Sequence, residues 1–212
     1  QLQYLVEREL KAGVEANKAR GGTAIVMDPL TGEILAMANY PTFNPNAVGR
    51  ATNEQLRNRA LADVYEPGST FKIVTASAAI EGNIVTPSEL IDTNPGYIVI
   101  PGRSRPIYDT HRNGVIPFEE VIIKSSNVGA VKVGLRTGVE RMTRYVKLFG
   151  FGQLLAPDLA GGTRGLWNPN NLSESGLASV SMGYQVGVTP LQMVTAASAV
   201  ANGGLLMEPH LV

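Results

Sequence analysis

Apolar residues at the start of the chain recur at helical spacing. Leucines and valines from Leu2 to Val14 stand three or four positions apart, and charged residues such as Glu7 lie between them. This period predicts an amphipathic helix on the surface of the fold.

A different pattern follows Gly21 and Gly22. Residues 23–28 and 33–38 are almost continuously apolar, and Pro29-Leu30-Thr31-Gly32 between them is a turn sequence. Two such runs joined by a short turn predict a β-hairpin. Because the apolar residues do not alternate with polar ones, we expect both faces of the hairpin to be covered.

A Pro- and Asn-rich connection spans residues 39–68 and leads to Ser69. Loops of this length are uncommon in compact domains and often carry function. From Ser69 to Gly82 the chain is apolar on nearly every side, which predicts a buried central helix rather than a surface one.

The rest of the chain is predicted to be mainly helical. Residues 88–112 are expected to be irregular, with one short strand at 97–100. Further helices are predicted at residues 118–123, 128–136 and 139–149. A last helix begins with the capping box Thr189-Pro190-Leu191-Gln192, which has Pro at the first helical position, and runs to Gly203-Gly204.

Composition limits the classes of function. The 212 residues are 44% hydrophobic with a mean hydropathy of +0.03, which suits one sizeable domain with a core. The 18 basic and 18 acidic residues cancel, and no basic block is interleaved with aromatic residues, so nucleic acid is not expected as a partner. Cysteine is absent and His111 and His210 are the only imidazoles, which argues against a zinc site, a thiol nucleophile or a histidine-based triad.

The sequence contains no run of about 18 apolar residues, so we expect no transmembrane segment within it. Its first residues, Gln1-Leu2-Gln3-Tyr4, include neither an initiator Met nor a basic leader. We therefore expect any membrane or targeting segment to lie outside this sequence.

Ser69 and Lys72 are the residues at which we expect chemistry. Three positions apart at the start of a helix, they project from one face, so the amine can reach the hydroxyl. Lys72 is also the only charged residue from Thr70 to Ile80, and a desolvated lysine loses its proton more readily and can act as a base. The structural alternative makes Ser69 an N-cap and lets Lys72 reach out from a buried face.

A second polar cluster, Lys124-Ser125-Ser126-Asn127, lies between two predicted helices. Asn127 is a suitable N-cap for the helix from Val128, which is the structural interpretation. In an extended segment, however, Ser125 and Asn127 would point the same way. A hydroxyl there could relay a proton while an amide holds the carbonyl or N–H of a substrate.

Ser69-x-x-Lys72 followed by Ser125-x-Asn127 resembles the first two motifs of the penicillin-recognising serine acyltransferases. The chain is similar, from about residue 20 onward, to the class B, monofunctional penicillin-binding proteins, most of all to the cell-division type. The similar segments are Asp28-Pro-Leu-Thr-Gly, Tyr40-Pro-Thr-Phe-Asn-Pro-Asn, Glu66-Pro-Gly-Ser-Thr-Phe-Lys, Lys124-Ser-Ser-Asn-Val-Gly and Gly183-Tyr-Gln-Val-Gly-Val-Thr-Pro-Leu-Gln.

The resemblance implies an α/β fold of the α+β type, the penicilloyl-serine-transferase fold. In that fold, helices flank a mostly antiparallel central sheet, and an all-helical lobe lies beside it. Residues 1–212 would form a partial transpeptidase domain, with the membrane anchor, the N-terminal pedestal and the C-terminal region outside it. That C-terminal region would carry the family's third motif, Lys-Thr-Gly or Lys-Ser-Gly, which does not occur in this sequence.

The activity that the resemblance implies is D,D-transpeptidation, which cross-links peptidoglycan. Ser69 would attack the carbonyl of the penultimate D-Ala of a stem peptide, Lys72 would accept its proton, and terminal D-Ala would leave. Ser125 would pass a proton to the leaving amine. β-Lactam antibiotics would acylate the same serine, because their strained amide mimics the D-Ala-D-Ala bond.

Substrate binding is predicted for Asn127, which the resemblance assigns, and for Tyr184 and Gln185, whose place before Gly187 equally suits core packing or a turn. No cofactor and no metal is expected. The resemblance implies peptidoglycan stem peptides, β-lactams, a membrane glycosyltransferase and division proteins as partners. It also implies a location in the bacterial inner membrane, with the catalytic domain on the periplasmic or extracytoplasmic side.

Other functions stay open at this point. Ser-Thr-Phe-Lys is also the first motif of class D β-lactamases and penicillin-sensing receptor domains, although Ser-x-Val is usual where this chain has Ser125-x-Asn127. A further alternative is a scaffold that binds a partner without turnover, since the third motif is missing.

Overall fold

The computed structural model describes residues 1–170 and 172–211, which form two compact units. The first, here called the sheet unit, comprises Gln1–Tyr65, Phe149–Gly165 and the chain from Val188 onward. The second, the helical unit, comprises Glu66–Leu148 and Leu166–Gly187. All the predicted catalytic residues belong to the helical unit.

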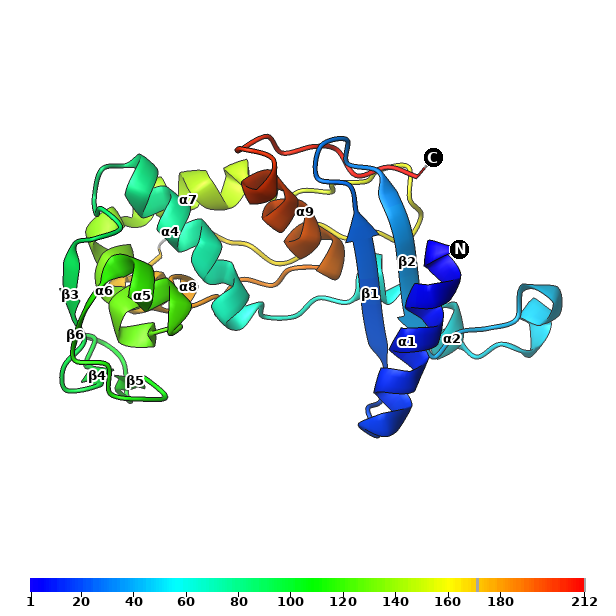
Figure 1. The fold of residues 1–212 in the computed structure, drawn as a ribbon, viewed down its shortest axis with the longest axis horizontal. Helices are drawn as coiled ribbons and strands as arrows, with labels where there is room; N and C mark the ends of the chain where they lie inside the picture. The colour runs from blue at the N-terminus through cyan, green and yellow to red at the C-terminus, as the bar shows by residue number, and fades with distance from the viewer. Residues whose placement is uncertain (171, 212) are drawn as a thin grey trace. The chain divides into compact units, whose positions relative to one another are not determined.

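The sheet unit contains the predicted hairpin. Strands β1 (Gly22–Met27) and β2 (Ile34–Tyr40) pair antiparallel, and the register shifts between Val26 and Met27. Helix α1 (Leu2–Ala16) lies along both strands, as Figure 1 shows in blue. The predicted hairpin and the predicted amphipathic helix are both confirmed.

Both faces of the hairpin are covered, as the sequence predicts. Ile25 and Met37 pack into a core cluster with Leu61 and with Leu191 of helix α9 (Pro190–Ala201). On the other face, a Cβ at Gly22 would lie 2.9 Å from both Leu10 and Val14 of α1. The near-continuous apolarity of the strands therefore reflects two packed faces.

At Met37, a side chain occupies the hydrogen-bonding groups on the outer edge of β2. Gln3 of α1 donates from Nε2 to the Met37 carbonyl at 3.0 Å and accepts from the Met37 N–H at 2.8 Å. The amide of Gln3 thus fills the place of one residue of a neighbouring strand.

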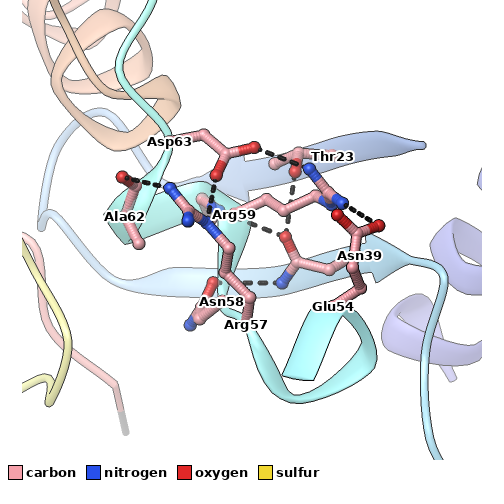
Figure 2. Close-up of polar contacts among 9 residues, drawn as sticks. Thr23, Asn39, Glu54, Arg57, Asn58, Arg59, Ala62 and Asp63 are labelled. Atoms are coloured by element: carbon pink, nitrogen blue, oxygen red, sulfur yellow. Dashed lines mark hydrogen bonds and ion pairs between the residues drawn. The ribbon is translucent and has the colours of Figure 1, made fainter. Parts of the chain in front are cut away.

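The long connection after the hairpin contains three short helical segments, η1 (Pro45–Arg50), α2 (Asn53–Leu56) and α3 (Arg59–Ala62). The side chain of Asn39 in β2 ties α3 to the hairpin, as Figure 2 shows. Its Oδ1 accepts from the Thr23 hydroxyl at 2.9 Å and from the Ala60 N–H at 3.1 Å, and its Nδ2 donates to Asn58 Oδ1 at 3.0 Å. We call these contacts the Asn39 junction.

Salt bridges surround this junction (Figure 2). Arg59 reaches Asp63 at 2.9 Å and Glu54 at 3.1 Å, and Arg57 reaches Asp63 at 2.5 Å. Neutral hydrogen bonds of Asn39 therefore fix the chain that leads toward Ser69 to the sheet, and ion pairs brace that segment internally.

The helical unit is built around α4 (Lys72–Glu81), which packs against three other helices. Those helices are α5 (Phe118–Ile123), α6 (Asn127–Thr137) and α7 (Val139–Leu148). Helix α8 (Glu174–Val180) contacts α6 (Figure 1). Val74, Ala78 and Ala79 of α4 are fully buried, which confirms the predicted central helix.

Short strands complete the helical unit. Strand β3 (Leu90–Asp92) pairs antiparallel with β6 (Val115–Pro117), and β4 (Tyr97–Ile98) pairs antiparallel with β5 (Ile107–Tyr108). The strand predicted at 97–100 therefore ends after Ile98. No helix in the described part of the chain is long and apolar enough to cross a membrane.

Two helices of the helical unit differ from the sequence predictions. The helix predicted to begin at Ser69 begins with a 3₁₀ turn, η2 (Gly68–Phe71), and becomes α-helical only at Lys72. Helix α8 is not predicted at all, because its short, mixed sequence gives no clear period.

Candidate active site

Ser69 lies in the 3₁₀ turn that precedes α4, and its side chain is exposed. The turn depends on two glycines. Gly68 has φ +57°, and its N–H donates to the carbonyl of Gly183 at 3.0 Å. A Cβ at Gly183 would lie 2.0 Å from the Gly68 carbonyl oxygen, so any larger residue would displace the turn that carries Ser69.

Lys72, one helical turn further along, is 2% exposed. Its Nζ lies 3.2 Å from Ser69 Oγ and 3.0 Å from Ser125 Oγ. It also donates to the carbonyl of Ser125 at 2.6 Å and to Asn127 Oδ1 at 2.9 Å. The structure therefore brings all four predicted residues, Ser69, Lys72, Ser125 and Asn127, together around one amine.

The oxygens around Lys72 suit a neutral amine. The Ser125 carbonyl and Asn127 Oδ1 can only accept, and they match the two N–H bonds of a neutral amine. The two hydroxyls can donate, so the remaining lone pair of Nζ can accept a proton from Ser69 Oγ or Ser125 Oγ.

Burial lowers the pKa of Lys72 to about 8, and the negative charge of Asp109 opposes that shift. With a pKa of about 8, about one molecule in ten carries the neutral amine at pH 7. That fraction is roughly 300-fold larger than for a lysine with its ordinary pKa of 10.5. The site is therefore equipped with a base adjacent to a hydroxyl nucleophile.

The Ser125–Asn127 segment is a turn, not the extended segment expected from the sequence. Ser125 has φ +55°, in the left-handed region, and the N-cap of α6 is Ser126 rather than Asn127. Ser126 Oγ accepts from the Gly129 N–H at 2.9 Å. The amide of Asn127 instead bridges Lys72 and the Tyr108 carbonyl, to which its Nδ2 donates at 3.0 Å.

Asp109 is a residue of this site that sequence reasoning missed. Its Oδ1 accepts from the backbone N–H groups of Asn127 at 2.5 Å and Val128 at 2.9 Å. Its Oδ2 accepts from the Ser126 hydroxyl at 2.7 Å. Asp109 is part of an irregular segment 17 to 19 residues before these donors, and no local motif signals the contact.

Tyr184 and Gln185 follow Gly183, whose carbonyl holds the turn of Ser69. Both are exposed, and the N–H of Gln185 donates to Glu66 Oε1 at 2.8 Å, with Gln185 at φ +58°. Their loop is thus fixed beside the turn of Ser69 by its backbone. Substrate binding by the two side chains stays a prediction.

The site joins a hydroxyl, a base of lowered pKa, a second hydroxyl and an amide, which is the equipment of a serine acyltransferase. Residues 22–212 match the family described as "Penicillin binding protein transpeptidase domain". The chain belongs to this family, and the predicted recognition is confirmed.

Curated relatives are similar over nearly the whole chain. It is 36% identical over 215 residues to penicillin-binding protein PbpB of Mycolicibacterium smegmatis, covering 100% of this chain and 33% of that protein. It is also 36% identical over 205 residues to peptidoglycan D,D-transpeptidase FtsI of Escherichia coli strain K12, covering 96% of this chain and 34% of that protein. The chain thus spans about a third of the length of these relatives.

Solved structures confirm the fold class. The transpeptidase domain of Burkholderia pseudomallei penicillin-binding protein 3 has a TM-score of 0.87 at 36% identity, covering 98% of this chain and 58% of that one. Mycobacterium tuberculosis penicillin-binding protein 3 complexed with ampicillin has a TM-score of 0.88 at 37% identity, covering 95% of this chain and 45% of that one. The predicted α+β penicilloyl-serine-transferase fold is therefore confirmed.

Proposed function

We propose that this chain carries the nucleophile and the proton-transfer groups of a serine D,D-transpeptidase that cross-links peptidoglycan. The observation that carries the proposal is the position of Lys72 Nζ, within hydrogen-bonding distance of both Ser69 Oγ and Ser125 Oγ. The name of the relative FtsI, a peptidoglycan D,D-transpeptidase, supports the reaction class.

In the proposed reaction, neutral Lys72 takes the proton of Ser69 Oγ as that oxygen attacks the carbonyl carbon of the penultimate D-Ala. The tetrahedral oxyanion is stabilised by the backbone N–H of Ser69. When it collapses, the C–N bond breaks and the proton on Lys72 passes through Ser125 Oγ to the departing amine of D-Ala. An ester on Ser69 and free D-Ala result.

The second half of the reaction runs through the same groups in reverse. The amine of an acceptor stem peptide attacks the ester carbonyl and loses a proton toward Ser125 and Lys72, and Ser69 leaves as its hydroxyl. Asn127, held by Lys72 and the Tyr108 carbonyl, would orient the peptide or a β-lactam side chain.

The proposal extends to the whole protein. A Lys-Thr-Gly or Lys-Ser-Gly strand after residue 212 would supply the carboxylate-binding groups and the second oxyanion donor. The domain would act on the extracytoplasmic side of the bacterial inner membrane, together with a membrane glycosyltransferase and division proteins. No cofactor takes part in these steps.

Incubation of the full-length protein with a fluorescent penicillin, followed by intact-mass spectrometry, tests the proposal. We expect a stable adduct on Ser69 that is absent in the Ser69→Ala variant. The exposed Ser104→Ala variant, in the same unit, serves as the control and should be labelled normally. Rapid release of the adduct would favour a β-lactamase, and a lack of adduct would favour a scaffold without turnover.

A further inference from the structure

One carboxylate organises the turn that carries Ser125. Asp109 accepts from three successive residues of that turn and of the first turn of α6, namely the Ser126 hydroxyl and the N–H groups of Asn127 and Val128. Ser126 is 1% exposed, so its hydroxyl would be costly to leave without a partner. Asp109 itself comes directly after β5, which pairs with β4.

The turn needs such support. Ser125 is a non-glycine residue with φ +55°, a conformation that persists only where surrounding contacts hold it. The catalytic distance depends on it, because Lys72 Nζ contacts both the carbonyl and the hydroxyl of Ser125. By fixing the three residues that follow, Asp109 fixes the position from which Ser125 Oγ faces Lys72.

The chemistry of the contact favours a carboxylate over an amide. These three partners all donate, as does Asn113 Nδ2 to Oδ2 at 3.3 Å, and a carboxylate has acceptor sites for all of them, whereas the NH₂ group of an asparagine would have to face at least one donor. The charge also lies at the N-terminus of the 11-residue helix α6, where the helix dipole stabilises an anion.

The same charge acts on Lys72. Within the described chain, Asp109 is the ionised group whose charge raises the pKa of Lys72, against the effect of burial. The direct contacts of the amine, Ser69, Ser125 and Asn127, are uncharged. Nearby Lys124 and Glu120 form an ion pair of their own at 2.6 Å on the exposed side of α5.

We propose that Asp109 is a positioning residue of the transpeptidase site, which holds the Ser125–Asn127 turn against Lys72 and presents a negative charge to that amine. This inference rests on the proposed function. It gives a role in the reaction to a residue outside the Ser-x-x-Lys and Ser-x-Asn motifs.

The test measures the second-order rate of acylation of the full-length protein by a fluorescent penicillin between pH 5 and 10. In Asp109→Asn we expect the rate at the plateau to fall about 10- to 100-fold, because Ser125 is misplaced. We also expect the acidic limb of the profile to move to lower pH, because Lys72 loses a neighbouring negative charge. Asp109→Glu keeps the charge, so the acidic limb of its pH profile should stay at the wild-type pH while its plateau rate of acylation falls.

Asp92→Asn is the matched control. Asp92 is another carboxylate of the helical unit, exposed and hydrogen-bonded to Asn94, and its variant should acylate like the wild type. Thermal unfolding by circular dichroism shows which variants fold. If Asp109→Asn does not fold, Asp109→Glu still decides: a wild-type rate at every pH overturns the inference.

The outcomes separate the two proposals. Acylation of the wild type at Ser69, with a reduced rate but an unshifted limb in Asp109→Asn, would make Asp109 a structural residue only. An unchanged rate and limb in that variant would remove its role altogether. A wild type that is not acylated at Ser69 would instead overturn the proposed function.

Discussion

Lys72 and Arg59 are both cations surrounded by oxygen atoms, but the oxygens differ. Lys72 is 2% exposed and its direct partners are two hydroxyls, a carbonyl and an amide oxygen. Arg59 has a side chain that is 19% exposed and binds the carboxylates of Asp63 and Glu54. Arg59 is neutralised by anions in direct contact with it, and Lys72 is not.

This difference in partners suits Arg59 to stabilising the fold and Lys72 to transferring protons. A guanidinium beside carboxylates remains protonated and can only hold the chain in place. A buried amine beside neutral oxygens loses part of its preference for the proton, so it can exchange one with a hydroxyl. If this distinction holds, changes around Lys72 should alter the rate of acylation, and changes around Arg59 should alter the free energy of unfolding.

The largest effect is expected for Lys72→Met, which removes the base but keeps an unbranched side chain of similar length. Acylation by penicillin should fall about 10²- to 10⁴-fold, the usual contribution of a positioned base. Stopped-flow fluorescence measures it. Lys132→Met is the control, since Lys132 donates to the Asp92 carbonyl at 2.5 Å and should be dispensable for acylation. A Lys72→Met variant as fast as the control would exclude Lys72 as the base.

Gly183→Ala is next. Its Cβ would collide with the backbone of Gly68, so we expect acylation to fall about 100-fold as Ser69 moves. Gly102→Ala separates this collision from backbone strain, because Gly102 has φ +75° but a Cβ placed there would meet no atom within 4 Å. The control should lose stability alone, by about 1 kcal/mol. Equal acylation rates for the two variants would contradict the role of Gly183.

Asn39→Ala tests the sheet unit, where we expect stability to change and the acylation rate to stay the same. It removes the hydrogen bonds of the Asn39 junction and leaves the Ala60 N–H and the Thr23 hydroxyl without that partner. Urea unfolding should show a loss of about 1–3 kcal/mol. The pH profile of acylation should not move. A shifted acidic limb would show that the sheet unit affects the base as well as stability. Asn46→Ala, at an exposed position of η1, is the control.

The smallest effect is expected for Glu54→Gln. Its carboxylate is 73% exposed and Asp63 still pairs with Arg59 in the variant. The free energy of unfolding should change by less than about 1 kcal/mol, and the change should shrink in high salt. Urea midpoints at low and high ionic strength measure it. A larger, salt-independent loss would mean that Glu54 acts through something other than its charge.

Local signals in the sequence are enough to predict much of this structure. Helix α1 follows from its helical period and the hairpin from two apolar runs joined by a turn sequence, and α9 has the predicted capping box with Thr189 as its N-cap. The pair Ser69 and Lys72 is recognisable because three positions of helical spacing are enough to bring the two side chains together.

Contacts distant in the sequence are beyond such prediction. Both Ser126 and Asn127 are suitable N-caps, and propensity alone cannot choose between them. The choice is made by Lys72, which engages the amide of Asn127, and by Asp109, which binds the hydroxyl of Ser126. The approach of Gly183 to Gly68 is equally invisible from local sequence, because it joins segments far apart in the chain.

The contact of Gln3 with β2 has a consequence for how the protein behaves in a crowded solution. Unpaired N–H and C=O groups on an edge strand invite pairing with another chain. At Met37 both groups are already engaged by one amide side chain, so a foreign strand would have to displace it. The side-chain amide of Gln carries a donor and an acceptor in one planar group, and Asn, which has the same amide, is one methylene shorter. Gln3 therefore hinders self-association at this part of the edge because its amide both donates and accepts. A charged residue such as Glu could not replace it, since a carboxylate only accepts.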